Sequence, residues 1–428
     1  MYKTNPMPIF DKIKKAFVPN LSVADYCLSL DVGTEFVKAL IFKNTNGKAQ
    51  VVGVGRFKQG LEDMQSGMVT DIDGVVKNCR EAIGQAEDQA GVSPDQVIIG
   101  IAGELVKGAS TIVKYDRAKP TTKIEMKELE EIVQKVQWQA FDEVRKQLAA
   151  ETGYQEIEVK LVNAAVVDVQ IDGYRVNNPI GFQGKRVSVS IFNSFAPLVH
   201  LGALQTIAEE LDLDLLSIAT EPYAVALSVG SQEAGEFSSI FIDIGGGTSD
   251  IALVRNGGVS GTKMFNLGGR AFTKRLSSHF NIPFDRAEQM KLDYANEKLD
   301  QSSAKMVKEV LSQDADVWMS GVELILEELS ASEHLPPRIL LCGGGSALPE
   351  IKQTLDKFDW QGKLPFARNP EVSFIHPEDV NNVTDETGLL SSPQDITPMA
   401  MANLARDLMG EEKVMSGLLR QVAKVLQS

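Results

Sequence analysis

Over the first hundred residues, apolar residues come in short runs separated by polar turns, and this pattern predicts an α/β arrangement. Continuous apolar runs are typical of buried strands, whereas apolar residues three or four positions apart indicate one face of a helix. The helical spacing holds over residues 71–89, where Ile72, Val76 and Ile83 recur. The predicted strands are residues 26–30, 36–42, 50–56 and 97–101.

Between residues 103 and 191 the pattern changes. A helix is predicted over residues 127–150, with Leu129, Ile132 and Val133 among the apolar residues on one side. Around it, alternating segments predict strands at residues 158–163, 166–171 and 186–192. We therefore expect a compact α+β module that is inserted between parts of a larger domain.

The rest of the chain returns to an α/β pattern. Helices are predicted at residues 199–211, 270–280, 284–295 and 305–329, and strands at residues 240–244, 251–255 and 338–342. A helix begins near Leu348, acidic and polar loops follow up to Met399, and helices continue to the end. An aspartate–glycine hairpin opens each α/β part, at residues 31–34 and 243–248, so we expect two halves that face each other across a cleft.

Both ends of the chain show a basic amphipathic helical pattern. Near the N-terminus, Ile9, Ile13 and Phe17 recur among lysines over residues 8–18. Near the C-terminus, over residues 411–428, one face carries Val414, Leu418, Val422 and Val425 beside Lys413, Arg420 and Lys424. Such a helix binds an anionic lipid surface through apolar burial and charge attraction, or it packs on its own domain.

Composition narrows the possible functions. The 428 residues carry 43 Lys and Arg against 58 Asp and Glu, a net charge of −15, which disfavours broad nucleic-acid binding. The three cysteines and four histidines are widely spaced, so we expect no disulfide framework, no zinc site and no His-rich metal site. A reducing cytosol is the simplest location for such a chain. No apolar run reaches the roughly 20 residues of a membrane-spanning helix, and the N-terminus lacks a secretory signal pattern.

The most informative motif is D-I-G-G-G-T-S-D, which starts at Asp243 between two predicted strands. Glycines let backbone N–H groups approach an anion closely, so Gly245, Gly246 and Gly247, with the Thr248 hydroxyl, are candidate phosphate ligands. Asp243 is a candidate for holding a hydrated Mg²⁺ that offsets phosphate charge. The alternative is a plain glycine-rich hairpin.

D-V-G-T, at residues 31–34, repeats this chemistry in the first half. Asp31 would be a second carboxylate facing the metal, and Gly33 and Thr34 would meet phosphate. Lys38 lies a few residues further along the second strand and is placed to reach the same phosphate. Alone the motif is weak, but paired with the second hairpin it indicates a phosphate site.

Three further segments extend this candidate site. L-L-C-G-G-G-S ends a buried strand, and Gly344, Gly345 and Ser346 would offer a flat backbone surface to a purine. Glu288 and Lys291 share a helix face and are candidates for contacting ribose, while Gly268 and Gly269 would close over a terminal phosphate. Glu221, in A-T-E-P-Y-A, is a candidate for orienting an attacking water, and its alternative role is a helix-start acid. An ordinary strand–turn–helix and a solvated surface pair are the alternatives for the first two segments.

Taken in order, these elements resemble the motifs of the actin-like ATPase superfamily. D-V-G-T and D-I-G-G-G-T resemble its two phosphate motifs, L-L-C-G-G-G-S its adenosine motif, and T-E-P-Y-A and A-E-Q-M-K its connecting and ribose-side segments. The resemblance implies an α/β, ribonuclease H-like, two-domain ATPase with ATP and Mg²⁺ in the cleft. It implies slow hydrolysis at most, with the nucleotide acting mainly as a clamp between the halves.

Within this superfamily the inserted module resembles the extra subdomain of the bacterial cell-division protein family FtsA. The segments that carry this resemblance are V-I-I-G-I-A-G-E from Val97, D-G-Y-R-V-N-N-P-I-G-F-Q-G-K-R-V from Asp172 and S-G-M-V-T-D-I-D from Ser66. The resemblance implies a protein that polymerises into filaments on the inner face of the cytoplasmic membrane, held there by its C-terminal helix, and tethers the tubulin-like protein FtsZ.

The chain departs from the FtsA pattern in two places. The basic segment at residues 8–18 is not usual in FtsA and favours the related pilus-assembly family PilM as the alternative, a cytoplasmic scaffold for type IV pili. Residues 294–305 are short where FtsA carries a longer hairpin in the subdomain that receives the FtsZ tail, so the resemblance supports FtsZ binding less strongly than ATP binding. The expected domains are residues 26–102 with 192–235 and residues 236–268 with 336–410, with an inserted subdomain at 103–191, a small subdomain at 269–335 and terminal segments at 1–25 and 411–428.

Overall fold

The computed structural model describes residues 25–103, 106–152, 158–176, 178–230, 237–330 and 333–409. The two basic amphipathic helices predicted at residues 8–18 and 411–428 lie outside these ranges. In the described part of the chain, no helix is both long enough and apolar enough to cross a membrane.

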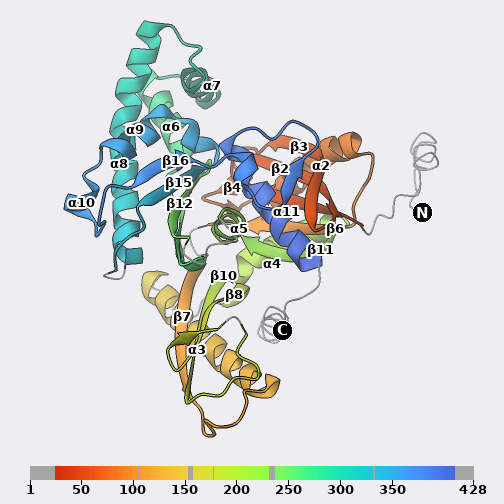
Figure 1. Cartoon of the computed structure of the whole chain (residues 1–428). Coiled ribbons are helices and arrows are strands. Elements are labelled where there is room, and N and C mark those ends of the chain that lie inside the picture. The colour runs from red at the N-terminus through yellow and green to blue at the C-terminus, as the bar shows by residue number, and fades with distance from the viewer. Residues whose placement is uncertain are drawn as a thin grey trace, which may run out of the picture.

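A six-stranded sheet with helices on both faces forms the first half of the molecule (Figure 1). Its strands, in spatial order, are β11 (Asp214–Thr220), β6 (Gln96–Ile101), β1 (Tyr26–Val32), β2 (Phe36–Thr45), β3 (Lys48–Lys58) and β17 (Val383–Asp385). Successive side chains of β1 point to opposite faces of the sheet. Leu28 and Leu30 pack toward α2 (Ile72–Ala90) and α4 (Leu198–Glu210). Cys27 packs toward α5 (Glu221–Ser228) and α11 (Ile396–Met409) on the other face.

The second half is built on a second sheet, whose helices cover its outer face. This part of the sheet runs β16 (Glu371–Phe374), β15 (Arg338–Cys342), β12 (Ser239–Ile244), β13 (Ser249–Arg255) and β14 (Gly258–Phe265). Its outer face packs on α6 (Gly269–Phe280), α7 (Phe284–Ala295), α8 (Gln301–Ser330), α9 (Pro349–Lys357) and α10 (Trp360–Lys363). On the other face Phe241 and Ala252 share a core with α5 and α11, so these two helices lie between the sheets.

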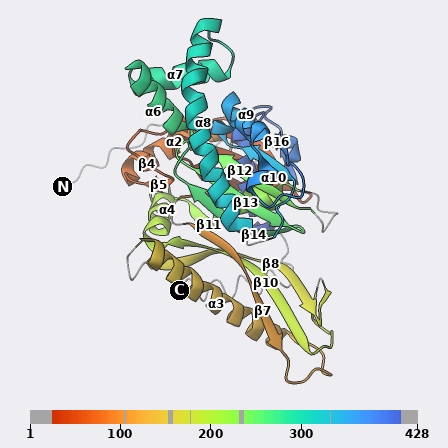
Figure 2. The same cartoon turned by 90° about the vertical axis from the view of Figure 1, so that its left-hand side faces the viewer.

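A separate module extends away from both halves, at the bottom of Figure 1 and Figure 2. It consists of α3 (Met126–Thr152) and the strands β7 (Lys107–Asp116), β10 (Arg186–Pro197), β8 (Val159–Ile171) and β9 (Tyr174–Arg175). Its core joins Ile132 and Val133 of α3 to Val187, Val189 and Ile191 of β10. β7 also pairs with β14, through Thr262 opposite Gly108, so the module continues the second sheet.

The remaining short elements lie at connections. They are the hairpin strands β4 (Met64–Gln65) and β5 (Met68–Val69) and the 3₁₀ turns η2 (Gly344–Ala347), η3 (Pro377–Asp379) and η4 (Pro393–Asp395). The β4–β5 hairpin reaches the first phosphate motif, because the backbone N–H of Gly67 donates to Thr34 Oγ1 at 3.2 Å.

The structure corrects the predicted elements in three ways. The strands β7, β11 and β14 were not predicted; β14 contains two glycines, and β11 runs into α5 without a turn signal. The two strands predicted at residues 158–163 and 166–171 form the single strand β8, because Ala164 and Ala165 between them continue the pairing with β10. The segment predicted as loops before Met399 holds the short strands β16 and β17.

Candidate functional site

A cleft between the two halves brings together most of the predicted site residues. Among the residues that line it are the predicted Asp31, Gly33, Thr34, Lys38, Glu221, Asp243, Gly245, Gly246, Thr248, Gly269, Glu288, Lys291, Gly344 and Gly345. The first half contributes through β1, β2 and α5, and the second through β12, β13, α6, α7 and the turn after β15. Residues almost the length of the chain apart therefore share one cavity wall.

Four carboxyl groups converge on one end of the cleft: Asp31, Glu221, Asp243 and Asp250. Asp31 and Asp243 come from equivalent positions, near the end of the first strand of each hairpin. Lys38, paired with Asp31 in the β1–β2 register, donates to Asp31 Oδ2 at 2.8 Å. The positive charge of Lys38 lowers the pKa values of Glu221 and Asp243 as well.

The carboxyl groups of this cluster outnumber the positive charges near them. Burial raises the pKa of Asp250 to about 7, and nearby Asp243 adds to the shift. Burial raises the pKa of Glu221 well above its usual value, and the charges of Asp31, Asp250 and Asp243 raise it further. Although burial alone would lower the pKa of Lys38, Asp31 outweighs it and raises that pKa. A divalent cation would offset the excess negative charge.

The donor set fits a hydrated Mg²⁺ better than a metal held by protein alone. Among the described residues, no group of three or more His, Cys, Asp or Glu side chains is placed to hold a metal ion directly. Asp31 and Asp243 would therefore act on the metal through water, with phosphate oxygens completing its shell, as Mg²⁺ commonly requires.

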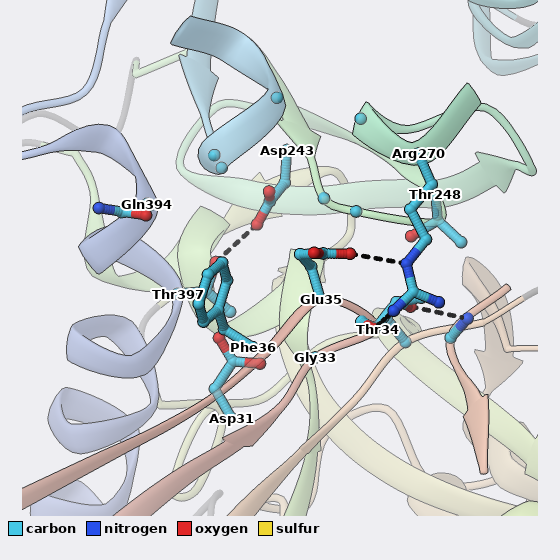
Figure 3. Close-up of a pocket in the computed structure, with 18 of the residues that line it drawn as sticks. Asp31, Gly33, Thr34, Glu35, Phe36, Asp243, Thr248, Arg270, Gln394 and Thr397 are labelled. Atoms are coloured by element: carbon cyan, nitrogen blue, oxygen red, sulfur yellow. Dashed lines mark hydrogen bonds and ion pairs between the residues drawn. The ribbon is translucent and has the colours of Figure 1, made fainter. Parts of the chain in front are cut away.

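Two hydrogen bonds orient Asp243. Thr397, in the first turn of α11, donates to Asp243 Oδ2 at 2.5 Å, and the Cys342 thiol also contacts this carboxylate (Figure 3). Burial raises the pKa of Asp243, while the Thr397 bond and Lys38 lower it. Because α11 packs on the first sheet, this bond ties the first half to the carboxylate of the second.

The two glycine hairpins approach each other closely. A Cβ on Gly246 would lie 2.8 Å from Glu35 Cβ, so a larger residue could not occupy this position without moving the first half. Thr34 Oγ1 accepts the Gly67 N–H and keeps its own proton for a ligand, whereas Thr248 Oγ1 donates to Asp250 at 2.9 Å. Gly247 packs against Thr34 and does not line the cleft.

The turn after β15 packs one glycine tightly and exposes the next at the cleft. Gly343 has φ +81°, and a Cβ there would lie 2.1 Å from Asp243 Oδ1. Gly344 is exposed, and the nearest atom to a Cβ added there is Gln394 Cβ at 3.8 Å. Ser346, in contrast, is fully buried, and its hydroxyl donates to the Gly343 carbonyl at 2.7 Å, so the structure does not bring it to the cleft.

Glu288 and Lys291 form a buried pair on α7 rather than a solvated surface pair. Lys291 Nζ lies 2.8 Å from Glu288 Oε2 and also donates to the Gly269 carbonyl at 3.1 Å. Gly269 therefore lies within reach of both the cleft and this pair. Gly268 packs on the carbonyls of residues 245 and 246 and stays outside the cleft wall.

The cleft residues that were not singled out from the sequence include Asp250, Arg270 and Thr397. Asp250 closes the D-I-G-G-G-T-S-D motif, and the alternation of β13 could have placed it beside Asp243, which it faces in the β12–β13 register. Arg270 directly follows Gly268 and Gly269, but only the tertiary structure shows where its side chain reaches. Thr397 lies more than 150 positions from Asp243, and no local pattern marks it.

Comparison with known proteins finds similarity to one family. A family model described as cell division protein FtsA matches residues 240–394. The cell division protein FtsA of Streptococcus pneumoniae serotype 2 is 25% identical over 424 residues, which cover 93% of this chain and 88% of that protein. The FtsA of Neisseria meningitidis serogroup B is 28% identical over 355 residues, 78% of this chain and 81% of that protein. The chain is thus similar to FtsA proteins along most of its length.

A solved structure shares the fold of this chain. The PilM–PilN type IV pilus biogenesis complex contains a chain that superposes with a TM-score of 0.60 and 18% identity, covering 91% of this chain and 99% of that one. At this level of identity the likeness concerns the fold alone. The fold is the actin-like nucleotide-binding fold, as the order of the sequence motifs predicted.

Proposed function

We propose that the protein is an ATP-binding adaptor of bacterial cell division, which polymerises on the inner face of the cytoplasmic membrane and tethers FtsZ. The similarity to FtsA proteins supports the role in division. The observation that carries the nucleotide part is the cleft, where two aspartate–glycine hairpins and four carboxyl groups converge from opposite halves.

The ligand assignments follow from this geometry. Gly33, Thr34, Gly245, Gly246 and Thr248 would hold the phosphates, with Lys38 near them. Gly344 and Gly345 would support the adenine, and Glu288 and Lys291 would face the ribose. Mg²⁺, when bound, would neutralise phosphate charge, with Asp31 and Asp243 orienting its water ligands.

Glu221 is proposed to position a hydrolytic water. It begins α5 at the boundary between the halves and lies in the cleft, and its raised pKa makes its carboxylate a stronger base than an ordinary glutamate. Hydrolysis would be slow, and nucleotide would act mainly by holding the halves together.

A PilM-like pilus scaffold is the second candidate, and the fold likeness to PilM supports it. In the same direction, α7 and α8 are joined by residues 296–300 alone, where the FtsA resemblance predicts a longer hairpin in the subdomain that receives FtsZ. The two candidates differ in whether the protein holds lipid and forms filaments.

The experiment is liposome co-sedimentation with ATP and Mg²⁺, comparing the full chain with one that ends at Gly410. Anionic and neutral vesicles are compared, and the pellets are viewed by electron microscopy. Pelleting of the full chain on anionic vesicles, with filaments and loss on truncation, supports the adaptor. Pelleting that survives truncation moves the anchor to residues 8–18. Neither lipid binding nor filaments would favour the pilus scaffold.

A further inference from the structure

Arg270 crosses from the second half of the molecule to the first at one end of the cleft. It lies in the first turn of α6, and its guanidinium Nε donates to Glu35 Oε2 at 2.7 Å. The same guanidinium donates to the backbone carbonyls of Thr34 at 2.6 Å and Met64 at 3.2 Å (Figure 3). All of these acceptors belong to the first half, and they surround the D-V-G-T motif.

The backbone of Arg270 holds the opposite hairpin. Its N–H donates to the Gly246 carbonyl at 2.8 Å, and Gly246 in turn packs against Glu35. One residue thus fixes the second glycine hairpin through its backbone and the first through its side chain. Substitution of the Arg270 side chain would remove its contacts with the first half and leave its backbone hydrogen bond to Gly246 in place.

Glu35 puts a carboxylate at the end of the cleft where the phosphates are proposed to lie. It directly follows Thr34, lines the cleft and has a largely buried side chain, 14% exposed. Its Oε1 is buried and lies 3.8 Å from Lys58 Nζ, beyond hydrogen-bond distance. Without Arg270, this carboxylate would carry little compensation and would repel a polyphosphate.

We propose that Arg270 makes the cleft selective for the phosphates of its ligand, by neutralising Glu35 and by fixing the backbone at Thr34. It is a positioning and specificity residue that favours nucleoside di- and triphosphates over the nucleoside. This inference rests on the proposed function, since it presupposes that nucleotide binds in this cleft.

Substitutions of Arg270 and of Glu35 should change nucleotide affinity in different directions. Arg270→Gln leaves Glu35 beside the phosphates with the more distant and half-exposed Lys58 ammonium as its remaining cationic partner, so nucleotide affinity falls. Glu35→Gln removes that anion and leaves the Arg270 cation in place, so affinity for phosphates stays level or rises. A purely mechanical latch between the halves would instead make both substitutions weaken binding.

The test measures the affinity of the full chain for ATP, ADP and adenosine by titration calorimetry with Mg²⁺. The variants are Arg270→Gln, Glu35→Gln, the double variant and Arg275→Gln, a control on the same helix whose exposed side chain pairs with Asp314. We expect Arg270→Gln to weaken ATP binding about tenfold or more and adenosine binding less than about twofold. Glu35→Gln should not weaken ATP binding, the double variant should recover most of the loss, and Arg275→Gln should match wild type.

Two results would overturn the inference while leaving the proposed function intact. One is an equal loss of ATP and adenosine affinity in Arg270→Gln, and the other is a weakening of ATP binding by Glu35→Gln. If wild type binds neither ATP nor ADP, the proposed function itself fails. Melting curves accompany each variant, and if Arg270→Gln does not fold, the sign of the Glu35→Gln effect decides the question alone.

Discussion

Gly343 is the position where a single methyl group should damage both the fold and the site. Its φ of +81° and ψ of 155° lie in a region that only glycine occupies readily, and forcing another residue into such a region costs about 1–3 kcal/mol. An added Cβ would also lie 2.1 Å from Asp243 Oδ1 and 2.5 Å from the Ile244 carbonyl. Relieving such overpacking costs about 1–3 kcal/mol more.

Gly343→Ala should therefore lose roughly 2–6 kcal/mol of unfolding free energy, which corresponds to a fall in melting temperature of about 2–7 °C for a chain of this length. The clash falls on Asp243 itself, so the variant should also bind ATP with Mg²⁺ more weakly. Calorimetric melting and titration calorimetry measure the two effects.

The neighbouring glycine provides a matched control. Gly344 is exposed, and its nearest neighbour to an added Cβ lies at 3.8 Å, so Gly344→Ala should change stability by no more than about 0.5 kcal/mol. If Gly343→Ala melts and binds ATP like wild type, or if both variants are equally unstable, the packing of this turn against Asp243 has been misread.

Two further predictions concern the carboxyl cluster. Thr397→Val removes a donor from Asp243 and should reduce the Mg²⁺-dependent gain in ATP affinity by roughly tenfold, whereas Thr397→Ser should keep it; equal loss in both variants would contradict this role. Because the pKa of Asp250 is raised to about 7, the folded state binds its proton more tightly than the unfolded state, so this carboxyl lowers stability as pH rises from about 4 to 7. The free energy of unfolding of Asp250→Asn relative to wild type should therefore be greater at pH 8 than at pH 5, by about 1 kcal/mol or more. Denaturant titrations of the nucleotide-free proteins measure it, and a difference that does not depend on pH would refute the assignment.

Local patterns were enough to predict the two hairpins that carry the site. In each, a strand of apolar residues ends in an aspartate followed by glycine and threonine, and the structure brings both ends to one cleft. The spacing of apolar residues also predicted the two α/β halves and the inserted module. In each helix and strand, the face that carries the apolar residues is the face that packs in the core.

What the sequence could not supply were contacts made by side chains across the cleft. Arg270 reads as an ordinary residue at a helix start, and Thr397 as an ordinary residue in an apolar helix, until the halves are placed together. For Ser346 the local pattern was misleading. A hydroxyl after three glycines resembles a ligand group, but within the turn it donates to the Gly343 carbonyl.

The central claim is that the cleft binds ATP with Mg²⁺ through Asp243. Titration calorimetry of the wild-type chain and of Asp243→Ala, with melting curves to show that both are folded, tests it most directly. The account predicts one ATP bound per wild-type chain in a Mg²⁺-dependent manner and no detectable binding to Asp243→Ala. A folded Asp243→Ala that binds ATP as wild type does would contradict the assignment of this cleft.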